Sequence, residues 1–179
     1  LDLSFCIFAR RGEKYSCYLE KMRRKLGLQQ ADKRDDESLI ADLFTALQDQ
    51  KTDFTLFFRN LSEVSNIHGE PLPPKLEQNF KNGVPPAFIR WLGRYRQRLR
   101  AENSDPAERA IRMNLTNPLY ILRNYLAEQA IAQARNGDYR EIERLRRCLA
   151  RPFDEQAEFA DLAEPPPEGS MPVCVSCSS

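Results

Sequence analysis

Apolar residues recur three and four positions apart along most of the chain, which is the spacing of one face of an α-helix. The first apolar stripe consists of Tyr15, Tyr18, Leu19, Met22 and Leu26. It ends at Gly27, and glycine is favoured just past a helix C-terminus. The second stripe consists of Leu39, Ile40, Leu43, Phe44 and Leu47. Asp35 or Asp36 can cap this second helix, and Thr52 then opens a short segment rich in phenylalanine.

Prolines mark the starts of the helices that we predict further along the chain. Pro85 and Pro86 stand where a helix start tolerates proline, and the apolar stripe after them is Phe88, Leu92, Tyr95 and Leu99. Asp105, Pro106 and Glu108 combine a cap, a first-turn proline and an acid three residues on, as in a capping box. A weaker helix is predicted over residues 75–80.

Asn117 and Pro118 repeat this device, and we expect Asn117 to cap a helix that Pro118 begins. The expected inner face of this helix is Leu119, Leu122, Leu126 and Ala130, and the helix ends at Gly137. Asp138 is expected to cap a last helix that buries Ile142, Leu145 and Leu149 and stops before Pro152. Period-two alternation is nearly confined to residues 1–8, so we predict an all-α fold.

Composition narrows the class of protein. The 179 residues carry a net charge of +1, which selects neither nucleic acid nor an acidic substrate as a partner. No apolar run approaches the roughly 18 residues of a membrane helix. Five cysteines without regular spacing argue against a secreted disulfide framework and favour a reducing compartment. Because the chain does not begin with Met, we expect it to be part of a longer protein.

Motifs of catalysis are missing from the sequence. His68 is the only histidine, and its polar neighbours favour a solvated loop. No glycine-rich phosphate loop and no kinase signature occurs. We therefore predict no catalytic, cofactor-binding or metal site within this chain.

One predicted helix is crowded with arginine, at Arg90, Arg94, Arg96, Arg98 and Arg100. Trp91 and Tyr95 lie among these side chains, so the face could grip phosphates and stack bases. The favoured interpretation is a solvated helix face above an aromatic core stripe. Its charges would be neutralised by the acids of the tail, which are Asp154, Glu155, Glu158, Asp161, Glu164 and Glu168.

Cys174 and Cys177 form a Cys-x-x-Cys pair near the end of the sequence. Zinc would need two more ligands, and the other cysteines offer no matching pair, so we expect a redox thiol instead of a metal site. In an extended chain the two Cα atoms would be about 10 Å apart, beyond the ~7 Å that a disulfide spans. A Cys174–Cys177 bridge would therefore be strained, although Cys174 is the nearest candidate partner.

Several segments together resemble the selenoprotein O family, also called YdiU-like. They are residues 21–28 (KMRRKLGL), 53–61 (DFTLFFRNL), 117–126 (NPLYILRNYL), 151–155 (RPFDE) and 175–179 (VSCSS). Their order and spacing match the C-terminal region of the family over residues 15–179. Residue pattern and resemblance together divide the chain into an unmatched segment over residues 1–14, a helical domain over residues 15–150, and an extended acidic, proline-rich tail over residues 151–179.

The resemblance implies a kinase-like enzyme that binds ATP with Mg²⁺ or Mn²⁺ and transfers AMP to Ser, Thr or Tyr hydroxyls of proteins. The family's nucleotide and metal ligands all lie upstream, so none is carried over to this chain. Cys177 occupies the place of the selenocysteine of some members, and Ser176 precedes it. We therefore expect Cys177 to be a redox-regulatory thiol.

The expected partners are an upstream kinase-like catalytic domain and the protein substrates of the whole enzyme, with neither nucleic acid nor a membrane. Arg123 is expected to contact the catalytic half or an acidic neighbour. The expected compartment is the bacterial cytoplasm or the mitochondrion. The alternative hypothesis is a stand-alone helical interaction or nucleic-acid-binding module that uses the Arg90–Arg100 face.

Overall fold

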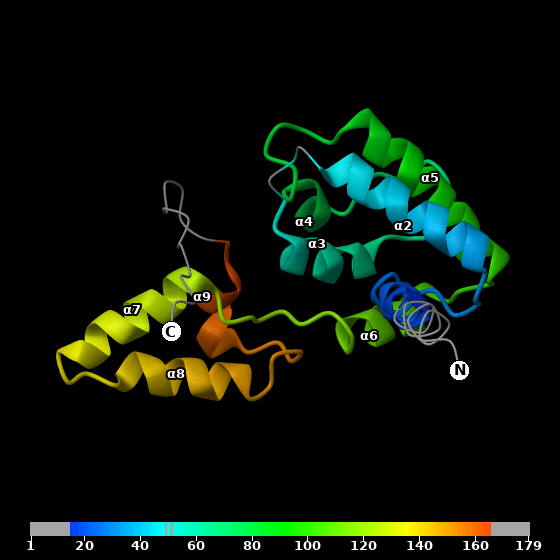
Figure 1. Ribbon diagram of the computed structural model, residues 1–179. Coiled ribbons are helices and arrows are strands. Elements are labelled where there is room, and N and C mark those ends of the chain that lie inside the picture. The colour runs from blue at the N-terminus through cyan, green and yellow to red at the C-terminus, as the bar shows by residue number, and fades with distance from the viewer. Residues whose placement is uncertain (1–14, 49, 51, 166–179) are drawn as a thin grey trace, which may run out of the picture. The chain divides into compact units, whose positions relative to one another are not determined.

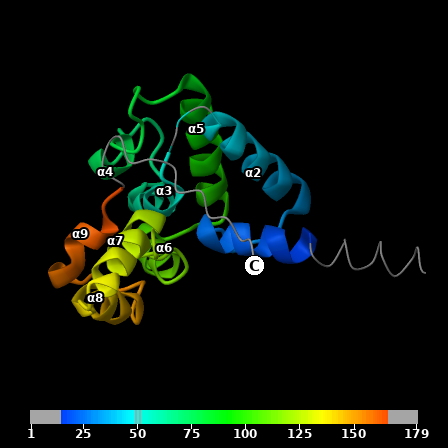
Figure 2. The same cartoon turned by 60° about the vertical axis from the view of Figure 1, so that its left-hand side comes forward.

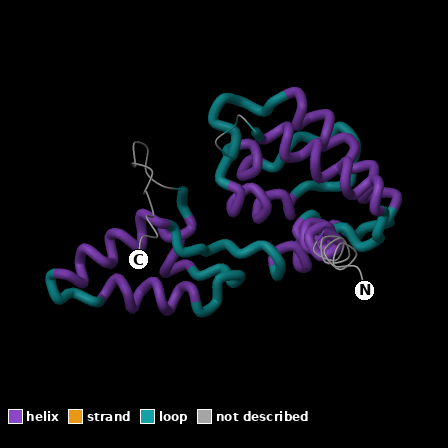
Figure 3. Tube along the Cα trace, in the orientation of Figure 1, coloured by secondary structure: helices purple, strands orange, loops and turns teal. Residues whose placement is uncertain are grey.

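The computed structural model describes residues 15–48, 50 and 52–165, and all regular structure in that part is helical (Figure 1, Figure 3). The all-α prediction is confirmed. After a first helix over residues 15–25, the helices are α2 (Lys33–Leu47), α3 (Phe54–Asn60), α4 (Pro74–Glu77), α5 (Pro86–Ala101), α6 (Pro106–Asn114), α7 (Asn124–Arg135), α8 (Arg140–Leu149) and α9 (Ala160–Ala163). Two 3₁₀ turns, Leu61–Glu63 and Ala157–Phe159, complete the set.

The chain divides into two compact units, Leu1–Asn117 and Pro118–Ser179. The division falls between Asn117 and Pro118, inside the segment that the sequence assigns to one helical domain over residues 15–150. Each unit has its own buried apolar cluster, so each can be understood from its own packing.

The core of the first unit is built around α5, which lies alongside α2 (Figure 1, Figure 2). Trp91 stacks on Tyr95 with ring centroids 5.0 Å apart, and its indole Nε1 donates a 2.8 Å hydrogen bond to the carbonyl of Leu39 on α2. The Tyr95 hydroxyl donates to the carbonyl of Leu26 at 2.7 Å. The predicted stripe of Phe88, Leu92, Tyr95 and Leu99 is buried throughout.

Carboxylate caps begin three of the helices in this unit. The Asp105 carboxylate accepts from the backbone N–H of Glu108 at 2.8 Å, which confirms the predicted capping box position. α2 begins earlier than predicted, because Asp32 reaches the N–H of Asp35 and is the cap. The cap of α3 is Asp53 and not Thr52. Where several residues able to cap a helix lie close together in the sequence, the sequence predicts the helix start only to within about one turn.

Gly27 ends the first helix in the way the sequence predicts. Its φ is +69°, and the N–H groups of Gly27 and Leu28 donate to the carbonyls of Arg24 and Arg23. This is a Schellman motif, in which the left-handed residue lets the next amides satisfy the last carbonyls of the helix. A Cβ at Gly27 would lie 2.6 Å from Cγ of Arg109, so the backbone and α6 approach closely here.

The second unit is an antiparallel pair, α7 and α8, closed by the segment that follows α8 (Figure 1). Its buried cluster consists of Tyr120, Leu126, Ala130, Leu145, Cys148, Phe159 and Leu162. The tail predicted to be extended from residue 151 is therefore helical over residues 157–163 and supplies two core side chains. Phe159 and Leu162 stand three residues apart, which is helical spacing inside a segment that looked acidic overall. Residues 166–179 of that tail lie outside the described part.

The prediction that Pro118 begins a helix is wrong, because α7 begins at Asn124 with Arg123 as its N-cap residue. The N–H groups of Leu119 and Tyr120 both donate to the carbonyl of Pro152, at 2.9 and 3.1 Å. Those two bonds hold the segment out of helical geometry and allow the Tyr120 ring to enter the core. The buried positions of α7 are Leu126 and Ala130, as predicted, whereas the side chain of Leu122 is 53% exposed.

In α8, the prediction for Leu145 is confirmed and that for Ile142 is wrong, since Ile142 is exposed. Asp138 accepts from the N–H of Arg140 at 3.0 Å, as expected of a residue that stabilises the helix start. Its pKa is lowered to about 2 by the hydrogen bonds from Arg140.

The contrast between two leucines tests this packing. Leu126→Ala removes a buried side chain and should lower the free energy of unfolding by about 2–5 kcal/mol. Leu122→Ala should change it by less than about 1 kcal/mol, because most of that side chain already faces water. Urea unfolding monitored by circular dichroism measures both. Equal effects would show that Leu122 is packed as the sequence pattern suggested.

A pair of glycines tests the close approach at Gly27. Gly27 and Gly137 both end helices in Schellman motifs, with φ values of +69° and +81°, but a Cβ at Gly137 would meet nothing within 4 Å. Gly137→Ala should cost about 1 kcal/mol from the left-handed backbone alone. Gly27→Ala should cost at least about 1 kcal/mol more, because Arg109 and Met113 must move. The two unfolding free energies, measured side by side, should differ in that order.

Candidate functional site

Two arginines of α5, Arg94 and Arg98, are bound by acids of the first unit. Arg94 pairs with Asp42 and, at 3.3 Å, with Asp35. Arg98 pairs with Asp36 at 3.2 Å and with Glu102 at 2.8 Å. The Arg98, Asp36 and Glu102 side chains are 11%, 2% and 1% exposed, so this part of the network is almost dry.

Two further arginines of this helix donate hydrogen bonds to backbone carbonyls of a neighbouring loop. Arg96 donates to the carbonyls of Ser65 and Pro71, and Arg100 donates to the carbonyl of Asn66 at 2.7 Å. Arg90 is exposed and has no ion pair or hydrogen bond within the described part of the chain. Four of the five arginines therefore fasten α5 to its own unit.

Two of the tail acids that were expected to neutralise this face have partners within the second unit. Glu158 and Asp161 of the tail instead pair with Arg147 and Arg144 of α8, at 3.3 and 2.5 Å. α2 was the overlooked source of negative charge, although its run of acids is visible in the sequence.

Trp91 and Tyr95 are almost completely buried and are not available to stack on bases. A nucleic-acid face needs free cationic side chains for phosphates and open aromatic faces for bases. On α5, four of the five arginines are held by ion pairs or hydrogen bonds within the first unit, and both aromatic side chains are buried there. The geometry therefore argues against the nucleic-acid alternative.

Burial shifts the pKa values of the charged groups at the centre of the Arg98 ion-pair network. It raises the pKa of Asp36, and the nearby guanidinium groups of Arg98 and Arg23 act in the opposite direction. Burial alone would lower the pKa of Arg98, but its bonds to Asp35 and Glu102 outweigh that effect and raise the pKa. The ion pairs thus outweigh the desolvation cost of Arg98 and offset that of Asp36 only in part.

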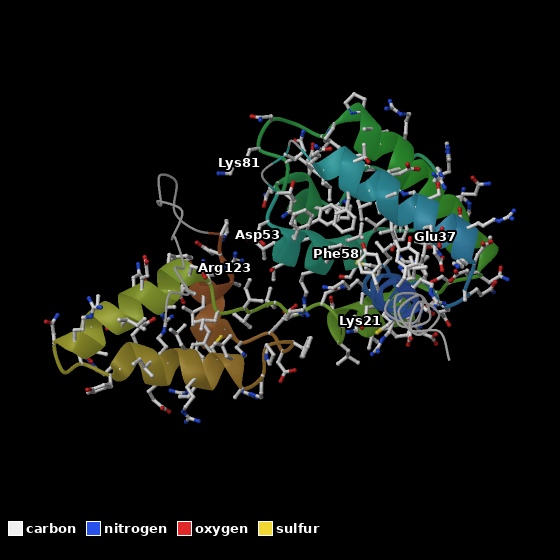
Figure 4. The ribbon with its side chains drawn as sticks, viewed as in Figure 1. Lys21, Glu37, Asp53, Phe58, Lys81 and Arg123 are labelled. Carbon is white, nitrogen blue, oxygen red and sulfur yellow. The ribbon has the colours of Figure 1, made fainter. Side chains whose placement is uncertain are left out.

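Asn117 joins two helix ends instead of capping a following helix. Its Nδ2 donates to the carbonyl of Lys25 at 2.9 Å, and its Oδ1 accepts from Lys25 Nζ at 3.4 Å. Arg59 donates to the carbonyls of Asn114 and Asn117 from the other side. The Lys25 ammonium lies 5.0 Å from the ring centroid of Phe58, which Figure 4 shows on α3. The Asn-Pro motif is therefore a clasp at the end of the first unit.

Arg123 is nearly buried at the start of α7, and its Nη2 donates to the carbonyl of Ala163 at 3.2 Å (Figure 4). This bond ties α7 to the end of α9 within the second unit. Its expected contact with a catalytic half stays a prediction.

Arg109 is a buried residue that the sequence pattern did not reveal. Its side chain is completely buried on α6, and it donates to the carbonyl of Val64 and to Oδ1 of Asn66. It stands four residues before the buried Met113, so the helical spacing was a usable signal. The polar residue type concealed it, because arginine is rarely fully buried.

The described residues contain no group of three or more side chains able to hold a metal ion. Cys17 is exposed and Cys148 is buried, and burial raises the pKa of the Cys148 thiol. Cys174 and Cys177 lie outside the described residues. His68 is exposed in a turn, which confirms the solvated-loop prediction. Within the same range, no helix combines the length and apolar character that crossing a bilayer requires.

Removal of the central arginine tests the network. Arg98→Gln leaves the buried carboxylates of Asp36 and Glu102 without a main partner, and should lower the free energy of unfolding by about 3 kcal/mol or more. Arg90→Gln removes one exposed arginine from the same helix and should have an effect within about 0.5 kcal/mol. Chemical unfolding at neutral pH measures both, and similar values would refute the buried network.

Comparison with known proteins extends the result. The family described as Protein adenylyltransferase SelO matches residues 9–150. The match begins inside the segment 1–14 that showed no resemblance, and it ends before the position of Cys177.

Curated relatives carry the description Protein nucleotidyltransferase YdiU. One from Pseudomonas paraeruginosa is 43% identical over 162 residues, covering 90% of this chain and 32% of the relative. Another, from Cupriavidus pinatubonensis, is 42% identical over 164 residues, with 90% and 31% covered. A third, from Myxococcus xanthus, is 39% identical over 162 residues, with 90% and 32% covered. The chain thus spans about a third of the length of these relatives, and it belongs to the SelO family of protein adenylyltransferases.

Proposed function

We propose that this chain is the helical C-terminal portion of a protein adenylyltransferase, which transfers AMP from ATP to Ser, Thr or Tyr hydroxyls of proteins. In this proposal the chain is a structural and regulatory region beside a kinase-like catalytic domain. The observation that carries the proposal is the family match over most of the chain, combined with coverage of only about a third of each relative.

The reaction explains why a separate catalytic domain is needed. The hydroxyl oxygen bonds to the α-phosphorus of ATP, the bond to the departing pyrophosphate breaks, and the hydroxyl proton passes to a base. Divalent metal and basic side chains must hold the charge that develops on the phosphates. In this proposal the residues that hold ATP and its divalent metal belong to the separate catalytic domain.

Hydrogen bonds from buried arginines to the chain's own backbone support a structural role. Buried arginines at positions 59, 96 and 109 donate to carbonyl groups of loops and helix ends. Such bonds fix the paths of irregular segments, which is what a rigid scaffold for a neighbouring domain requires. Location in a bacterial cytoplasm or a mitochondrion, protein substrates, and a redox role for Cys177 remain parts of this proposal.

The isolated chain should neither transfer AMP nor show a stoichiometric, Mg²⁺-dependent site for ATP. Calorimetric titration with ATP, with and without Mg²⁺, tests binding, and labelled ATP with an acceptor protein tests transfer. A micromolar Mg²⁺-dependent site would contradict the proposal.

A chimera tests whether the chain supports activity when a catalytic domain is present. The segment of the Pseudomonas paraeruginosa relative that matches this chain is replaced by this chain, and nucleotide transfer to protein is measured. The chimera should be active, and the same relative without the segment should be impaired. An inactive but folded chimera would indicate that this chain does not serve as that portion of the enzyme.

A further inference from the structure

A hollow of about 290 Å³ lies on the first unit, where the end of helix 15–25 meets the end of α6. Figure 4 labels Lys21 on the first of these helices. The lining residues are Arg24, Gly27, Leu28, Gln29, Arg112, Leu115 and Thr116. Two of them are arginines, and none carries a carboxylate.

Both guanidinium groups in the hollow have capacity for a further partner. Arg24 is exposed and has no ion pair or hydrogen bond within the described part of the chain. Arg112 Nη1 lies 3.8 Å from Glu108, which is too long for a hydrogen bond, and that carboxylate is 76% exposed. Arg112 Nη2 is buried and has no hydrogen-bond partner among the described residues.

The side chain of Arg109 packs directly behind Gly27, which is one of the residues that line the hollow. Arg109 donates to the carbonyl of Val64 and the amide oxygen of Asn66. Burial lowers the pKa of Arg109, and the charge of Arg112 lowers it further. Asp105 acts on Arg109 in the opposite direction, and Glu102 accepts from the N–H of Gln29. The positive charge that an anion can reach is therefore that of Arg24 and Arg112.

Arginines near helix C-termini often stabilise exposed carbonyls, and this is the simplest alternative explanation. Here those carbonyls already have donors. The carbonyl of Arg24 accepts from Gly27 N–H, and that of Arg112 accepts from the Thr116 hydroxyl at 3.0 Å. The carbonyl of Asn114 accepts from Arg59. The two arginines of the hollow are not consumed by the helix ends.

We propose that this hollow binds the oxyanion of a small organic acid, a carboxylate or a phosphate monoester, between Arg24 and Arg112. Guanidinium groups match the planar or tetrahedral oxygen arrangement of these anions. An apolar part of the ligand lies against Leu28 and Leu115. The volume is at the lower end of ligand pockets, which span roughly 300–1,000 Å³, so the ligand is small. This site is separate from the proposed AMP transfer, because no nucleotide or metal is involved.

The test follows backbone amide signals of the ¹⁵N-labelled chain by NMR at constant ionic strength. The probes are benzoate, phenyl phosphate and inorganic phosphate. Phenyl phosphate, benzoate or both should give saturable shifts at Leu28, Gln29 and Leu115. Inorganic phosphate should bind more weakly than phenyl phosphate, because it lacks the apolar group.

Two variants and a matched control decide the outcome. Arg112→Gln and Arg24→Gln should each weaken binding at least tenfold, whereas Arg90→Gln, which removes an exposed arginine elsewhere, should not. Arg24 makes no contact that the fold needs, so its variant keeps the test valid if Arg112→Gln unfolds. Saturable binding of benzoate alone assigns a carboxylate ligand, and that of phenyl phosphate alone assigns a phosphate ligand. Shifts that do not saturate, or that persist unchanged in the arginine variants, overturn the proposal.

Discussion

A buried arginine is tolerated only when acceptors surround its guanidinium group, and the first unit depends on this constraint. Arg98 meets carboxylates on two elements and thereby holds α5 against α2. Arg59 and Arg109 have backbone carbonyls as acceptors, at the end of α6 and in the loop before α4. Helix packing and loop path are therefore specified by the same residue type, since each guanidinium can bridge segments far apart in sequence.

Prediction from the sequence succeeded where one local rule decides the outcome. The all-α fold, the proline start of α5, the Asp105 cap and the end of the first helix at Gly27 all follow from spacing and single-residue chemistry. It failed at Pro118, where hydrogen bonds from the Leu119 and Tyr120 amides to the distant carbonyl of Pro152 accompany a non-helical path. It also failed for the partners of the α5 arginines, because a count of acids cannot say which helix will lie alongside. The hollow between Arg24 and Arg112 depends on the crossing of two helix ends and has no local signature.

Family membership and the two-unit division answer different questions. The family match places residues 9–150 within a protein adenylyltransferase family, while the compact units meet at Asn117. Asn117 belongs to the first unit through its bonds to Lys25, and the next residue opens the second unit. The Asn-Pro pair is thus the boundary between the units. Asn117 is hydrogen-bonded into the first unit, and Pro118, which has no backbone N–H, begins the second.

The carbonyl of Pro152 gives the second unit an unusual order of assembly. It comes after α7 and α8 in the chain, yet its hydrogen bonds with the amides of Leu119 and Tyr120 attach the non-helical segment that precedes α7. As the chain leaves the ribosome, residues 118–135 emerge before that acceptor exists, and the proline-led helix signal at Pro118 is then unopposed. We therefore expect α7 to begin nearer Pro118 in a chain that ends before residue 152, and at Asn124 once residues 152–163 are in place. The native start of this helix therefore depends on a segment that follows it in the chain.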